Sequence, residues 1–121
     1  MANNFVNFGS EYNYIATSQA NSGELNVKNG FIGVNNNTVT AEEIADTDRP
    51  SELKKVVMSL NGQYDLALHA GDTPSAGDIA YQDGTVATEI TTSNASGVKV
   101  GTFEGTYDSS TARIYLNKFF G

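Results

Sequence analysis

The sequence predicts an all-β fold, a single-domain β-sandwich or small β-barrel built from hairpins. The chain of 121 residues contains 13 Asn, 12 Thr, 10 Ser and 12 Gly, and these residues favour turns and strands over long helices. Short alternating or β-branched runs recur at roughly ten-residue spacing between turn signals, which is typical of sandwiches and barrels. We expect at most one short helical turn, near residues 41–48.

The length suits one domain, because domains commonly run to about 100–150 residues. Hydrophobic residues make up 39% of the chain, enough for a modest core. Residues 1–8 contain too few apolar residues to fold alone and are expected to form an N-terminal arm. Residues 9–121 are expected to form the single β domain.

The first half of the chain contains four strand-like runs, at residues 5–17, 24–27, 31–34 and 38–40. Aromatic and branched residues alternate with Asn and Ser in the first run, and the others are short apolar or β-branched segments. Asn-rich and Gly-containing turn signals separate them, as at Asn29-Gly30. We therefore expect a series of short strands joined by turns.

An acidic excursion at residues 41–53 interrupts this pattern. Glu42, Glu43, Asp46 and Asp48 cluster there ahead of Pro50. A helical turn near residues 42–45 has to end before Pro50, since proline lacks an N–H and restricts the residue before it. We expect an exposed segment between strands.

The second half predicts three hairpins. Residues 54–60 and 63–69 flank Asn61-Gly62, and Tyr64, Leu66 and Leu68 should share one face of the second strand. Residues 78–82 and 85–88 flank Asp83-Gly84, a strong hairpin signal. The last two strands are expected at residues 98–104 and 112–117, separated by a loop at 105–110.

Composition excludes several classes of function. The chain has no Cys, so disulfides, thiolate metal sites and cysteine nucleophiles are ruled out. The formal net charge is −7 and the basic residues are scattered, which argues against direct nucleic-acid binding. No secretion signal and no run of about 20 apolar residues is present, so we expect a soluble protein that does not bind a membrane.

No residue pattern predicts catalysis, a cofactor or a metal site. His69 is the only imidazole and is interpreted as a polar residue on the outward face of its strand. The spacing of Asp72, Asp78, Asp83 and Glu89 matches no calcium loop. We expect a non-enzymatic protein, and a small hydrolase that uses Asp78 or Asp83 is the weaker hypothesis.

Exposed aromatic and acidic residues are the candidates for binding a protein partner. Aromatics near both ends of a small β domain suit an interface, and an acidic run suits docking to a basic partner. The candidates are Phe5, Phe8, Tyr12, Tyr14, Glu42, Glu43, Asp46, Asp48, Phe119 and Phe120.

Several short motifs resemble a known family. Ala76-Gly77-Asp78-Ile79-Ala80-Tyr81, Val98-Lys99-Val100-Gly101-Thr102-Phe103 and Ala112-Arg113-Ile114-Tyr115-Leu116-Asn117 resemble the hairpin and closing strands of capsid decoration proteins of tailed bacteriophages. Upstream, residues 30–34 and 62–66 look like earlier strands of that family. The acidic excursion and the Asn-rich N-terminus depart from the pattern.

The resemblance implies a structural virion protein. Such a protein binds the outer surface of the expanded phage capsid and cements contacts between capsomers. The implied partners are the major capsid protein and further copies of the chain, with a trimer favoured. The protein would be made in the bacterial cytoplasm and end on the outer surface of the virion. The alternative is a head-fibre or surface adhesin module that binds a host glycan or protein.

Overall fold

The strands of the molecule form two antiparallel sheets. The computed structural model describes residues 11–120. The first sheet has the order β1-β4-β3-β2, from β1 (Glu11–Ile15), β2 (Leu25–Lys28), β3 (Phe31–Asn35) and β4 (Lys55–Ser59). The second has the order β5-β9-β8-β6-β7, from β5 (Gly62–Ala67), β6 (Ile79–Gln82), β7 (Ile90–Thr91), β8 (Lys99–Tyr107) and β9 (Thr111–Leu116). The predicted all-β fold is confirmed.

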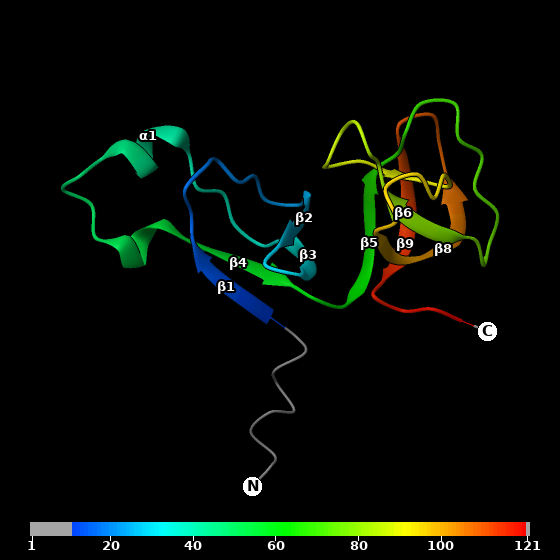
Figure 1. Cartoon of the computed structure of the whole chain (residues 1–121), viewed down its shortest axis with the longest axis horizontal. Helices are drawn as coiled ribbons and strands as arrows, with labels where there is room; N and C mark the ends of the chain where they lie inside the picture. The colour runs from blue at the N-terminus through cyan, green and yellow to red at the C-terminus, as the bar shows by residue number, and fades with distance from the viewer. Residues whose placement is uncertain (1–10, 121) are drawn as a thin grey trace, which may run out of the picture.

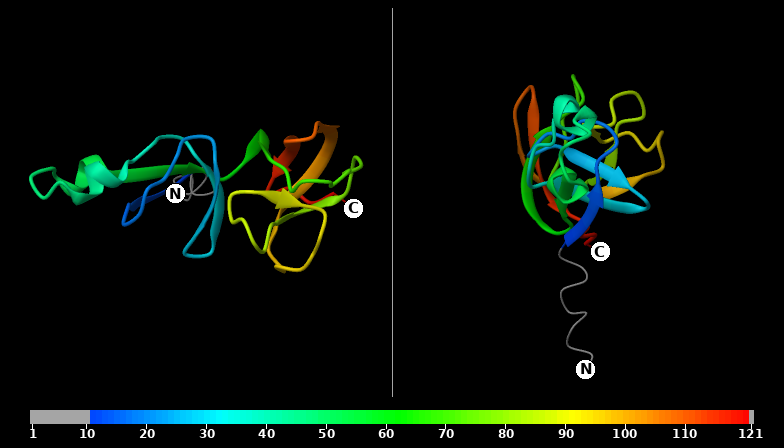
Figure 2. Two further views of the ribbon diagram at one scale, coloured as in Figure 1. Left: turned by 90° about the horizontal axis from the view of Figure 1, so that it is seen from above. Right: turned by 90° about the vertical axis from the view of Figure 1, so that its left-hand side faces the viewer.

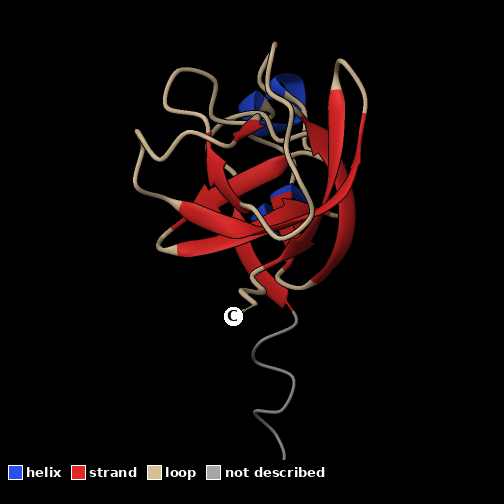
Figure 3. Ribbon diagram, turned by 90° about the vertical axis from the view of Figure 1, so that its right-hand side faces the viewer, coloured by secondary structure: helices blue, strands red, loops and turns tan. Residues whose placement is uncertain are grey.

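The two sheets lie side by side along the long axis of the molecule, and each curls into a half-barrel (Figures 1 and 2). Viewed along that axis, strands make up most of the regular structure (Figure 3). Among the described residues, no helix is both long enough and apolar enough to cross a membrane.

The predicted hairpin at Asn61-Gly62 is wrong. Strand β4 pairs with β1 and β3, whereas β5 pairs with β9, so the chain passes from one sheet to the other at this point. Val56 and Met58 are buried in the first core, while Leu66 is buried in the second. Burial of these side chains in different cores outweighs the local preference of Asn-Gly for a hairpin.

Two hydrophobic clusters hold the fold together. The first lies under the first sheet and contains Ala16, Ala20, Val39, Val56, Met58 and Leu60. The second is centred on β5, β8 and β9, but it also includes Leu25 and Val34 from the first sheet. Both of these residues are only 2% exposed, so the two sheets share this core.

The acidic excursion begins with the predicted helical turn. Helix α1 (Ala41–Ala45) is capped by Thr40, whose Oγ1 accepts from the Glu43 N–H at 3.1 Å while the Glu43 carboxylate accepts from the Thr40 N–H at 2.9 Å. The helix ends before Pro50, as expected, and the 3-10 helix η2 (Ser51–Lys54) leads into β4. Neither helix contains a buried residue, and the excursion protrudes at one end of the molecule (Figure 2).

Two other predicted strands differ from the structure. Val39 forms only an isolated bridge with Ala20. Residues 85–88 are not a strand, because the Asp83 carboxylate accepts from the Thr85 N–H and turns the chain away from β6. Strand β6 pairs instead with β7 and β8.

The final hairpin is confirmed, as is the shared face of Tyr64, Leu66 and Leu68. Strand β8 runs on to Tyr107, so the loop before β9 is shorter than predicted. Leu66 and Leu68 are buried and Tyr64 packs against the same core. The predicted arm at residues 1–8 lies outside the described residues.

Candidate functional site

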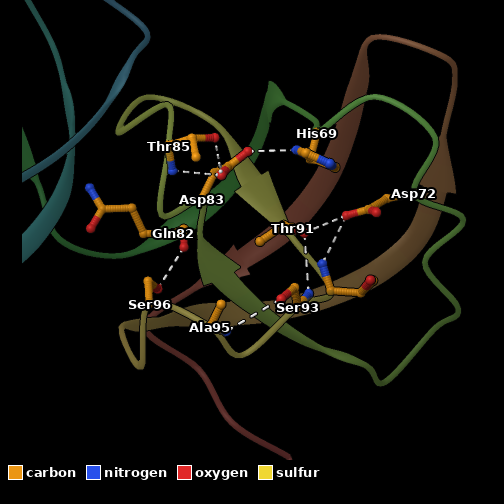
Figure 4. A network of polar contacts seen from close by, with 10 residues as sticks. His69, Asp72, Gln82, Asp83, Thr85, Thr91, Ser93, Ala95 and Ser96 are labelled. Atoms are coloured by element: carbon orange, nitrogen blue, oxygen red, sulfur yellow. Dashed lines mark hydrogen bonds and ion pairs between the residues drawn. The ribbon is translucent and has the colours of Figure 1, made fainter.

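The candidate site is a polar pocket of about 230 Å³ in the second half of the molecule (Figure 4). It is formed by residues that follow β5 and β6, by the last residue of β7 and by the segment after β7. The lining consists of His69, Asp72, Asp83, Gly84, Thr85, Thr91, Ser93 and Ala95.

Backbone pairing fixes the frame of this pocket. Leu68 and Ile90 form an isolated parallel bridge, and the His69 N–H donates to the Ile90 carbonyl at 2.9 Å. The Asp83 N–H donates to the Glu89 carbonyl at 2.8 Å. His69, Asp83 and Glu89 are therefore brought together by main-chain contacts that do not depend on their side chains.

His69 and Asp83 form the central contact. The Nδ1 atom of His69 lies 2.7 Å from Oδ2 of Asp83, while Oδ1 of Asp83 accepts from the N–H and the hydroxyl of Thr85. The Asp83 residue is 7% exposed, whereas the His69 side chain is 47% exposed. A buried carboxylate thus holds a solvent-facing imidazole in one orientation (Figure 4).

These contacts shift the ionisation of both groups. The Thr85 N–H, followed by the hydrogen bond from His69, lowers the pKa of Asp83 from 3.8 to about 2. The hydrogen bond to Asp83 is also the main cause that raises the pKa of His69 above 6.5. The pair therefore favours an ionised carboxylate and a protonated imidazole.

Two more carboxylates lie near His69. Asp72 Oδ2 accepts from the Thr91 hydroxyl at 2.5 Å and from the Thr92 N–H at 3.0 Å. Ligating atoms of Glu89, His69 and Asp83 all lie within 4.8 Å of one another. Negative charge on Asp83, Asp72 and Glu89 contributes to the raised pKa of His69.

Asp78 lies apart from this cluster. It directly precedes β6 and Asp83 directly follows it, so at about 3.3 Å per residue their backbones are on the order of 16 Å apart. Oδ2 of Asp78 accepts from the Ser75 N–H at 2.8 Å, which closes a local turn. Asp78 and Asp83 therefore do not form a carboxylate pair.

This site is not apparent from the sequence. There, His69 reads as an outward polar residue, Asp83 as a turn residue, and Asp72, Asp78 and Glu89 as structural carboxylates. The contact joins residues 14 positions apart, in the segments that follow β5 and β6, and it depends on the Leu68–Ile90 bridge. No local motif signals such a pairing.

The predicted partner-binding tyrosines are packed onto the first sheet. The Tyr12 ring stacks on Phe31 with centroids 4.1 Å apart, and its hydroxyl accepts from the Asn29 amide. The Tyr14 hydroxyl accepts from the Asn26 amide at 2.7 Å. Both tyrosines are half-buried. Phe5 and Phe8 lie outside the described residues.

Two of the predicted acidic contacts have local structural roles. Glu43 caps α1 and pairs with Arg49 at 3.6 Å, and Asp46 Oδ1 accepts from the Asp48 N–H at 3.0 Å. Glu42 and Asp48 are exposed.

The aromatic pair near the C-terminus is exposed. Phe119 is 48% exposed and Phe120 is 60% exposed. The Phe120 ring stands edge-on to Tyr115 of β9, with centroids 5.5 Å apart. The C-terminal segment and α1 lie at opposite ends of the molecule (Figure 1).

Comparisons of the chain with protein-family models, curated proteins and solved structures found no match.

Proposed function

We propose that the chain is a non-catalytic virion protein that binds the outer surface of an expanded phage capsid and cements contacts between capsomers. The motifs that resemble capsid decoration proteins fall on β6, β8 and β9, which are neighbours in the second sheet. The adjacency of these three strands supports the resemblance. The motif at residues 62–66 falls on β5 of the same sheet, whereas the motif at residues 30–34 falls on β3 of the first sheet.

The observation that carries the proposal is the exposure of Phe119 and Phe120. The chain has a mean hydropathy of −0.32 and a net charge of −7, so two adjacent exposed phenylalanines are unusual for its surface. Full burial of a Phe side chain stabilises by roughly 1.5–3 kcal/mol. Because each of these rings is about half exposed, a partner that covers it can still contribute about half of that free energy. A contact of this size is weak singly, but many copies on a lattice multiply it.

The same segment leads back to the core through β9. Tyr115 supports Phe120, and the neighbouring Leu116 is fully buried. An apolar patch anchored on a central strand suits a contact that has to resist outward pressure on the shell. The partners in this proposal are the major capsid protein and further copies of the chain, as a trimer, on the outside of the virion.

The test is co-sedimentation with expanded heads that lack this protein, taken from the phage that encodes the chain. We expect the wild-type chain to sediment with the heads and the Phe119→Ser/Phe120→Ser variant to remain in solution with an unchanged melting temperature. Val86→Ser is the matched control, since Val86 is 43% exposed in the same half of the molecule. Failure of the wild-type chain to bind the heads would overturn the proposal.

The polar pocket favours one second candidate, a surface module that binds a host glycan. Its carboxylates, imidazole and hydroxyls are groups that hydrogen-bond sugar hydroxyls. Binding of the isolated chain to a glycan array, lost in Asp72→Asn and retained in the exposed control Asp48→Asn, would support this function. Absence of glycan binding would exclude it.

A further inference from the structure

A donor set suited to a metal ion lies beside the pocket, and two of its three residues, His69 and Asp83, line the pocket. An imidazole nitrogen of His69 and carboxylate oxygens of Asp83 and Glu89 lie within 4.8 Å of one another. We propose that these three residues bind a divalent transition-metal ion of the Zn²⁺ class. This site is independent of the capsid contact, because it lies at other residues than Phe119 and Phe120.

The donor atoms need only a small adjustment in spacing, and the proton between Nδ1 of His69 and Oδ2 of Asp83 has to leave when the ion binds. Ligands of a four-coordinate ion at about 2.0–2.2 Å stand about 3.4 Å from one another. The His69 and Asp83 atoms are 2.7 Å apart and would have to separate slightly, while the Glu89 carboxylate would move inward. Glu89 is only half-buried, so its side chain has room for that movement.

The backbone holds the three ligands in place before any ion binds. Main-chain hydrogen bonds join His69 to Ile90 and Asp83 to Glu89. Oδ1 of Asp83 is held by Thr85, which leaves Oδ2 directed at His69. Orientation of a ligand by an outer hydrogen bond is the usual arrangement around protein metal ions.

Charge and donor type select the class of ion. The carboxylates of Asp83 and Glu89, with Asp72 close by, give the proposed site a negative charge that favours a cation. An imidazole ligand suits Zn²⁺ and related ions, whereas Ca²⁺ prefers six to eight oxygens. Three protein ligands leave a fourth coordination position, where water or an exogenous group can bind.

A structural ion pair between His69 and Asp83 is the competing interpretation of the same contact. In that case Glu89 contributes only its negative charge, and a metal ion has no effect on the imidazole. The two interpretations therefore differ in the role of Glu89.

The test is a titration of the 121-residue chain with ZnCl₂. The NMR signals of the imidazole nitrogens are the readout. His69 is the only histidine, so these signals need no assignment. We expect saturable changes in the imidazole signals, and an apparent Kd that rises at least about tenfold in Glu89→Gln. Glu42→Gln, an exposed residue in α1, is the matched control and should bind Zn²⁺ like the wild type.

Three results would overturn the proposal. They are an imidazole that does not respond to excess Zn²⁺, equal Zn²⁺ affinity in Glu89→Gln and the wild type, and an equal response to CaCl₂. Melting curves recorded in EDTA establish that Glu89→Gln is folded. The capsid-binding experiment is unaffected by any of these outcomes, so the two proposals fail separately.

Discussion

His69 and Asp83, which both line the pocket, are joined at 2.7 Å, and the two partners differ sharply in exposure. Asp83 is buried and is held by Thr85, whereas His69 faces solvent. The contact links the segment after β5 to the segment after β6. Its strength depends on pH because both groups titrate.

We predict that this pair stabilises the fold most between pH 3.8 and 6.5. The pKa of His69 is raised, so its contribution is complete below 6.5 and is lost as the pH rises through the folded-state value. The pKa of Asp83 is lowered to about 2, so its contribution is complete above 3.8 and is lost as the pH falls toward 2. The difference in melting temperature between the wild type and His69→Gln, measured in EDTA, should be largest inside this window.

A direct titration tests whether Asp83 is the main cause of the raised pKa of His69. In Asp83→Asn the pKa of His69, followed by NMR in EDTA, should fall toward 6.5, since its main hydrogen-bond partner no longer carries charge. An unchanged pKa in a folded variant would show that Asp72 and Glu89 dominate instead.

Asn117 links the two sheets. Its φ is +57°, and its side-chain amide donates to the Ile32 carbonyl at 2.8 Å and to the Leu60 carbonyl at 2.7 Å. Asn117→Asp keeps the size and the tolerance of a positive φ, but it sets a carboxylate against two carbonyl oxygens. We expect a loss of about 2 kcal/mol in the free energy of unfolding, measured by urea denaturation.

Asn94→Asp is the control for Asn117→Asp, because Asn94 lies exposed in a loop. It should change stability by less than about 0.5 kcal/mol. Equal effects of the two substitutions would mean that added charge, rather than the lost link between sheets, is responsible.

The sequence predicts the strands of the last third well because they are long and contain many buried residues. Ala112, Ile114 and Leu116 are buried at every second residue of β9, whereas residues 100–103 of β8 are buried in succession. The strands β1, β2 and β3 in the first half of the chain are harder to predict, since they are four or five residues long and carry few buried side chains. Strand pairing depends on which side chains are buried in the same core. Asn61-Gly62 therefore wrongly predicts a hairpin, because β4 and β5 bury their side chains in different cores.

The pocket could not be predicted for a related physical reason. Its residues are ordinary loop residues when taken singly, and their chemistry arises only when the bridge between Leu68 and Ile90 aligns His69 with Asp83. Phe119 and Phe120, in contrast, were predicted as partner contacts from position and type alone. Their exposure is consistent with that prediction and leaves it open to the binding test.

We predict that no larger residue can replace Gly101, because its α-carbon lies against the backbone of the neighbouring strand β9. A Cβ atom there would collide with the carbonyl oxygen of Tyr115, a backbone atom that cannot move without disturbing the β8–β9 pairing. Gly101→Ala should therefore destabilise the chain by at least about 2 kcal/mol. At Gly84 the nearest atom to a new Cβ is the Ser96 Cβ at 4.0 Å, so Gly84→Ala should melt within a few degrees of the wild type. Similar melting temperatures for both variants would contradict the close approach.

Phe103 is the largest of the fully buried side chains, at 1% exposed, and we predict that the second core depends on it. Phe103→Ala should cost about 3–5 kcal/mol, a large part of the stability of a small domain, because the cavity cannot be filled by its strand neighbours. Phe31→Ala is the matched control. Phe31 is 42% exposed and stacks on Tyr12, so its loss should cost about 1 kcal/mol. Urea denaturation of the two variants measures the difference directly. If Phe31→Ala were the more damaging change, the first sheet rather than the second core would limit the stability of the fold.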